Sequence, residues 1–263
     1  MIRPNLQKKI YRLFRRFTRL LSLPAWHLPE GQIKNSVRRT ILKFQHALPR
    51  EMEVNSGETV IQVGTPWPKT IQIFSRRVGP AGRVIVFEAM PDNQARLEKG
   101  ISELALTNTT LVKAAASSSC GTGKLAISPI AGDHKIPLED IKMDNDLRSE
   151  NENMEMLEVP FLTIDHVVDD FKIEDVHFIS ITVNGAELEV IQGALETLSK
   201  APVKSRVHVK GHALQADGTP LNKRICEELQ NAGYSTLITK GEWSSAPGSG
   251  WERRAGDVFG WKE

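Results

Sequence analysis

Polar residues that could bind a nucleotide follow two β-rich runs in the first half of the chain. Gln62, Gly64 and Thr65 lie at the end of TVIQV (59–63), and Glu88 closes RVIVFE (83–88). In open α/β sheets, ligands bind beyond the carboxyl ends of the strands. A glycine there lets the backbone approach a ligand closely, and an acid after the next strand can accept hydrogen bonds from ribose hydroxyls. This spacing predicts a nucleotide-type cofactor site.

A second group of polar residues follows later strands. Thr182 and Asn184 lie at the end of HFISITV (177–183), and Lys210 and His212 follow SRVHV (205–209). His212, or alternatively His208, titrates in the range that a general base needs, although a structural hydrogen bond explains either histidine equally well. The two histidines lack a third recognisable ligand, so we predict no metal site.

Alternating short apolar runs and helical patterns must position these residues. Helices are predicted over 69–78, 91–104, 186–198 and 219–233, between β-rich runs at 59–63, 83–88, 110–114, 177–183, 205–209, 235–239 and 257–261. Strands that alternate with helices form mainly parallel sheets covered by helices on both faces. The predicted fold class is therefore α/β, a Rossmann-like doubly wound sheet, over residues 55–263.

Two polar segments interrupt this alternation. Residues 131–158 are acid-rich and predict a surface insertion. The sequence does not distinguish a lid over the site from an ordinary surface loop. Residues 241–256 form a loop rich in Gly, Ser and Trp between the last two predicted strands. Its tryptophans could contact a ligand or pack on the sheet.

The start of the chain is predicted to be helical and is basic. Residues 1–22 carry seven Lys and Arg and no acid, and their apolar residues recur at helical spacing. This pattern is typical of an amphipathic helix that lies on an anionic membrane, and equally of one that packs on the domain or on another protein chain. A helical lead-in is predicted over 23–54.

Composition limits the possible classes of protein. The net charge is +2, so the seven positive charges of residues 1–22 leave −5 on the remainder, which argues against nucleic-acid binding by the whole domain. Two cysteines are too few for a disulfide framework. No apolar run reaches the length of a membrane-spanning helix. These features favour a cytoplasmic protein, with peripheral membrane contact through residues 1–22 left open.

Several segments in succession resemble the FkbM-type methyltransferases. VIQVG (60–64), VFEAMPDN (86–93) and ISITVNGAELEVIQGA (179–194) match that family's motifs in order and spacing, and the resemblance covers roughly residues 55–240. It implies a class I methyltransferase fold that binds S-adenosylmethionine. The residues it places at the cofactor are Gln62, Gly64, Thr65, Glu88, Ala89 and Met90, and it places Thr182 and Asn184 at the substrate side.

The chain departs from the family pattern where acids are expected. Neutral or basic residues occupy four such positions: Gln62, Thr182, Asn184 and Lys210. Pro68 replaces a glycine of the first motif, which removes an N–H and excludes a positive φ. S-adenosylmethionine is cationic, and each lost charge-assisted hydrogen bond is worth roughly 1.5–3 kcal/mol.

Two hypotheses about function follow from the matches and the departures. The first is an S-adenosylmethionine-dependent methyltransferase that methylates a hydroxyl of a sugar or natural product, with a small-molecule or glycan acceptor. The alternative is a catalytically inactive methyltransferase-fold protein that acts as a binding or scaffold module. The two differ in whether Trp67 and Pro68 fill the cofactor space.

Overall fold

The computed structural model describes residues 54–128, 134–138, 141–143, 155–210, 213–215, 221–238 and 257–263, all within one compact unit that begins at Val54. The predicted helices of residues 1–53, the loop at 241–256 and His212 lie outside the described residues. The same holds for much of the segment 131–158.

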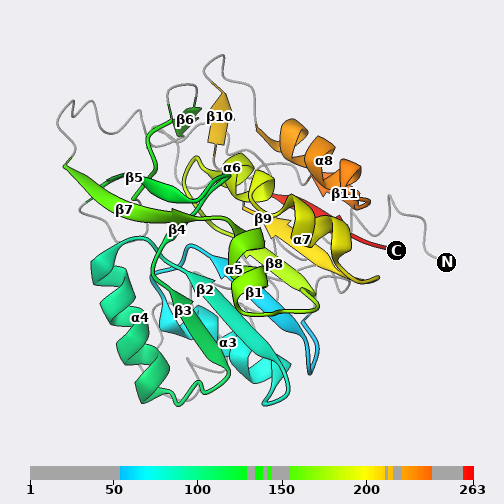
Figure 1. Ribbon diagram of the computed structural model, residues 1–263, viewed down its shortest axis with the longest axis horizontal. Helices are drawn as coiled ribbons and strands as arrows, with labels where there is room; N and C mark the ends of the chain where they lie inside the picture. Colours follow the sequence, from blue (N-terminus) through cyan, green and yellow to red (C-terminus); the bar gives the residue numbers. More distant parts are fainter. Residues whose placement is uncertain are drawn as a thin grey trace, which may run out of the picture. The chain divides into compact units, whose positions relative to one another are not determined.

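The central sheet has seven strands in the order β11-β12-β9-β8-β1-β2-β3 (Figure 1). Its strands are β1 (Thr59–Val63), β2 (Arg83–Phe87), β3 (Thr109–Val112), β8 (Phe178–Ile181), β9 (Arg206–Val209), β11 (Ser235–Ile238) and β12 (Val258–Trp261). The first five in chain order pair in parallel, whereas β12 is antiparallel to both β9 and β11. This is the predicted Rossmann-like sheet, with an antiparallel hairpin at one edge.

The central strands are buried on both faces. Ile61, Ile85, Ile179 and Val207 occur in β1, β2, β8 and β9 and are at most 2% exposed. Continuous apolar strands of this kind require a helical layer on each side. The helices that provide these layers are α3 (Pro68–Val78), α4 (Pro91–Glu103), α5 (Ile164–Asp170), α6 (Glu187–Gln192), α7 (Leu195–Lys200) and α8 (Asn222–Asn231).

Two small sheets extend beyond the central one. One contains β4 (Ala115–Ala116), β5 (Gly121–Ala126) and β7 (Met156–Leu162), and the other pairs β6 (Ile141–Met143) with β10 (Ala213–Gln215). The first sheet was not predicted as such, because its strands carry polar and small residues on their exposed side. The predicted strand 110–114 is in fact β3, and the following Ala115–Ala116 leaves the main sheet to pair with β7.

The predicted helix 186–198 is two helices. α6 ends at Gln192 and α7 begins at Leu195, with Gly193 between them. A side chain at Gly193 would collide with the backbone oxygen of Ser117, so the junction between the two helices requires glycine. Asp165 then accepts hydrogen bonds from the backbone N–H groups of Glu196 and Thr197, which caps α7.

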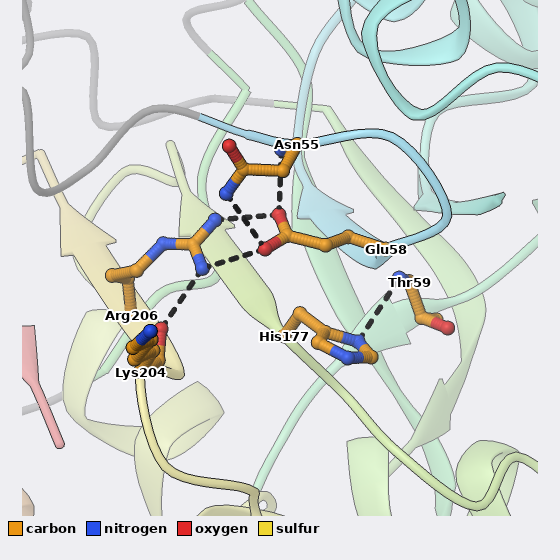
Figure 2. A network of polar contacts seen from close by, with 6 residues as sticks. All are labelled: Asn55, Glu58, Thr59, His177, Lys204 and Arg206. Atoms are coloured by element: carbon orange, nitrogen blue, oxygen red, sulfur yellow. Dashed lines mark hydrogen bonds and ion pairs between the residues drawn. The ribbon is translucent and has the colours of Figure 1, made fainter.

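The amino ends of the strands are joined by a buried ion pair (Figure 2). Arg206 donates from Nη1 and Nη2 to the two carboxylate oxygens of Glu58, at 2.9 and 2.6 Å. Asn55 donates to the same carboxylate through its backbone and side-chain nitrogens. Burial raises the pKa of Glu58, but the bonds from Arg206 and Asn55 together outweigh it, so its pKa lies below the ordinary value. This network fixes the start of β1 relative to β9.

Candidate functional site

A cavity lies at the carboxyl ends of β1, β2 and β8, where the strand order changes direction. The β1–α3 turn contributes Val63, Gly64, Thr65 and Pro66, and the residues after β8 contribute Thr182, Val183, Asn184 and Ala186. This switch point is where open α/β sheets bind ligands. The structure thus brings the residues predicted from separate strands to one place.

Gly64 is required by the packing of its turn. Its φ is +71°, and a Cβ there would lie 2.5 Å from the backbone oxygen of Thr182. Only glycine satisfies both conditions without strain. The sequence predicted that Gly64 lets the backbone approach a ligand closely. In the structure, the group that approaches Gly64 is the backbone of Thr182, directly after β8.

Gln62 is buried and turns toward its own loop. Its side-chain nitrogen donates to the backbone oxygens of Val63 and Gly64, at 3.1 and 3.0 Å. A carboxylate has no proton to donate at neutral pH, so an acid could not make these two bonds. Gln62 is not among the described residues that line the cavity. Its amide instead stabilises the turn between β1 and α3.

Glu88 is the buried carboxylate of the cavity wall. It directly follows β2, is 8% exposed, and its Oε1 accepts hydrogen bonds from the backbone N–H of Met90 at 3.0 Å and from Asn93 at 3.5 Å. Burial raises the pKa of Glu88, and the hydrogen bonds from Met90, Asn93 and Thr65 only partly oppose it. A carboxylate held in this way can accept from a diol.

The residues beside Glu88 divide between the cavity and the core. Ala89 lines the cavity. Met90 does not, and its side chain packs in an apolar cluster with Val159 and with Ala115 and Leu125, which do line the cavity. Met90 nevertheless contributes its backbone N–H to Glu88 and so positions that carboxylate.

Trp67 and Pro68 do not fill the cavity. Trp67 is 56% exposed. Pro68 begins α3 and packs on Gly100 of α4, and a side chain at position 100 would collide with the proline ring. Proline suits the first turn of a helix because an N–H at this position would have no partner within the helix, so its absence costs nothing. The change from glycine to proline therefore preserves the helix and leaves the space at the switch point open.

Part of the predicted insertion forms another wall. His134, Lys135 and Ile136 line the cavity, and Lys135 exchanges two backbone hydrogen bonds with Ala126 at the end of β5. Asn184 donates from its side chain to the backbone oxygen of His134 at 3.0 Å. Sequence reasoning missed these three residues as site residues. The one signal was the length of the insertion, which does not show which of its residues turn inward.

His134 is the histidine that reaches the cavity. Its Nδ1 accepts the backbone N–H of Ser128 at 3.1 Å, so the neutral ring carries its proton on Nε2. His208, by contrast, pairs through Nε2 with Asp257 at 3.1 Å and stacks on Phe259, as a cross-strand contact between β9 and β12. The described residues contain no group of three possible metal ligands.

Apart from Asn93, the remaining described lining is apolar: Phe87, Ala114, Ala115, Ala116 and Leu125. The cavity between these walls measures about 80 Å³. Pockets that hold whole cofactors or drug-sized ligands generally measure about 300–1,000 Å³. The walls must therefore move apart before a whole cofactor can enter.

The sheet order, the turn at Gly64 and the carboxylate at the end of β2 define a Rossmann-like α/β protein with a cavity at its switch point. Residues 52–236 match the methyltransferase FkbM domain, and the chain belongs to that family. None of the curated proteins matches the chain.

Solved structures of methyltransferases are similar to this chain. An FkbM methyltransferase from Methylobacillus flagellatus KT has a TM-score of 0.48 at 13% identity, over 90% of this chain and 56% of that one. A precorrin-6y C5,15-methyltransferase from Geobacter metallireducens GS-15 has a TM-score of 0.44 at 14% identity, over 87% and 88%. An Aeropyrum pernix fibrillarin with natively bound S-adenosyl-L-methionine has a TM-score of 0.43 at 11% identity, over 78% and 67%.

Proposed function

We propose that this protein is an S-adenosylmethionine-dependent methyltransferase that methylates a hydroxyl group of a sugar or another small molecule. Membership of the FkbM family supports the reaction class. The observation that carries the proposal is Glu88, a buried carboxylate at the end of β2 that lines the switch-point cavity. That position suits recognition of a ribose diol.

The chemistry of the cavity lining suits the nucleoside part of the cofactor better than its charged part. Glu88 would hold the ribose, and the small side chains of Ala114, Ala115 and Ala116 leave room for a flat base. Gln62, Thr182 and Asn184 provide no carboxylate for the cationic end. When bound, the cofactor supplies an electrophilic methyl group.

The acceptor hydroxyl must lose its proton in such a reaction. Thr182 and Asn184 line the substrate side but are not bases near neutral pH. His134 lines the same cavity, with its Nδ1 already accepting from Ser128, so in this arrangement it donates through Nε2. We therefore assign orientation of the acceptor to Asn184 and His134, and the proton of the hydroxyl passes to solvent water.

A non-catalytic binding protein is the second candidate, and two amides favour it. Gln62 and Asn184 stand where the family motif has acids, and both donate to backbone oxygens around the cavity. Neither amide carries the negative charge that stabilises a cationic ligand. Binding of S-adenosylmethionine would therefore be weakened, while the fold would remain.

Transfer of a labelled methyl group tests the proposed reaction. The full-length protein is incubated with S-adenosylmethionine labelled on its methyl group and a panel of monosaccharide and polyol acceptors. Formation of a base-stable methyl ether that disappears in a Glu88→Gln variant is the expected result. Cofactor binding without transfer to any acceptor would favour the non-catalytic candidate.

We also propose that residues 1–22 contact an anionic surface, because they hold seven basic residues and no acid. No helix among the described residues is long and apolar enough to span a membrane. Co-sedimentation with vesicles containing phosphatidylserine is expected for the full chain, and not after Arg12, Arg15, Arg16 and Arg19 are all changed to Gln. Equal sedimentation of both proteins would contradict this proposal.

A further inference from the structure

Trp67 is held on the surface by the chain around it. Pro68 begins α3 and restricts the backbone of the preceding Trp67 to an extended conformation, φ −112° and ψ 110°. Pro66, on the other side, lines the cavity. Its N–H bonds to Oγ1 of Thr65 at 3.3 Å, and its backbone oxygen accepts from Thr70 at 3.0 Å. The indole remains 56% exposed and cannot fold into the core.

Arg96 connects this tryptophan to the cavity. Its guanidinium lies over the indole, 5.9 Å from the ring centroid, and its Nη1 donates to Oδ1 of Asn93 at 2.8 Å. Asn93 in turn lines the cavity and donates to Glu88. An aromatic surface, a cation and the cavity wall thus form one continuous set of contacts.

We propose that Trp67 and Arg96 form a subsite beside the cavity that binds a sugar ring carrying a carboxylate. The C–H groups on one side of a sugar ring pack well on an aromatic face, and the guanidinium matches a carboxylate in shape and charge. This subsite rests on the proposed function for its role, because it adjoins the cavity wall formed by Asn93 and Glu88 and would hold an acidic acceptor at the mouth of the cofactor site.

A purely structural role explains less of what is observed. A cation–π contact at the surface is worth about 0.5–1 kcal/mol and needs only part of the ring. The contact with Arg96 therefore leaves part of the indole surface free for a ligand, since Trp67 is 56% exposed. Here Pro68 and the bonds to Thr65 and Thr70 fix the backbone of Trp67, and Asn93 holds the guanidinium of Arg96, so both groups are held before any ligand arrives.

Titration with two matched sugars tests the subsite. Methyl β-glucuronide carries the carboxylate and methyl β-glucoside does not, and their binding to the full-length protein is followed by NMR, with and without S-adenosylhomocysteine. The variants are Trp67→Ala and Arg96→Gln. Matched controls on α3 are Ile73→Ala, which removes another exposed apolar side chain, and Arg77→Gln, which removes another exposed cation.

The glucuronide is expected to bind at least about tenfold more tightly than the glucoside. Trp67→Ala should weaken both sugars by about tenfold or more, and Arg96→Gln should remove the difference between them. The controls should match the unmodified protein. Undetectable binding of both sugars, full affinity in Trp67→Ala, or a preserved preference in Arg96→Gln would each overturn the subsite. S-adenosylhomocysteine binding, measured in parallel, reports on the proposed function independently.

Discussion

The side-chain amide of Asn184 donates to the backbone oxygen of His134, with a nitrogen–oxygen distance of 3.0 Å. This bond joins the turn after β8 to the segment that closes one side of the cavity. An acid, which the family motif has at this position, could not make it. The substitution that looks like a loss in the sequence therefore creates a new contact across the site.

Asn184→Asp is expected to release the segment that contains His134. A carboxylate has no proton to donate and would repel the carbonyl oxygen of His134. Hydrogen exchange at the backbone N–H of Lys135, which bonds to Ala126, should become faster, while exchange in β2 stays unchanged. Unaltered protection at Lys135 would show that the bond does not hold this segment.

The sequence was sufficient to predict the sheet because its central strands are short apolar runs that helices separate. The position of Glu88 followed from the same pattern. The direction of Gln62 did not, because an amide at a strand end can turn toward a ligand or toward its own loop, and only the geometry of Val63 and Gly64 decides. His134 was missed because an irregular segment has no periodicity that indicates which of its side chains point toward the cavity.

Comparing Gly64→Ala with Gly57→Ala should separate two contributions to the loss of stability: the strain of a positive φ and the collision of a Cβ with a neighbouring atom. Both glycines have a positive φ, +71° and +84°, but a Cβ at Gly57 meets nothing within 4 Å. We expect Gly57→Ala to reduce the free energy of unfolding by about 1–2 kcal/mol. Gly64→Ala should lose at least about 1 kcal/mol more, since its methyl group meets the oxygen of Thr182. Urea denaturation measures both, and equal losses would show that the turn after β1 can relax.

Arg206→Met should destabilise the fold strongly. It leaves the buried carboxylate of Glu58 without its guanidinium partner, and breaking a buried pair in this way generally costs about 3–5 kcal/mol. Lys99→Met is the control, because Lys99 and Glu103 form an exposed pair on α4. That change should alter the free energy of unfolding by less than about 1 kcal/mol. Similar values for the two variants would mean that the network in Figure 2 is not important for stability.

Glu88 should make the protein less stable as the pH rises. Its pKa is raised in the folded state, so the folded protein keeps the proton longer than the unfolded chain does. Its contribution is fully present below the ordinary glutamate pKa of about 4.3 and is lost as the pH rises through the raised value. Relative to Glu88→Gln, the unmodified protein should therefore lose unfolding free energy across this window. A constant difference in urea denaturation from pH 4 to 8 would contradict the raised pKa.

Calorimetric titration with S-adenosylmethionine, and separately with S-adenosylhomocysteine, tests the central claim that the cavity beside Glu88 is a cofactor site. We predict micromolar binding, about −8 kcal/mol, that weakens at least about tenfold in Glu88→Gln. Glu103→Gln, an exposed change on α4, should bind normally. No heat and no thermal stabilisation of the unmodified protein at millimolar ligand would contradict the claim and leave the protein as a non-catalytic member of its family.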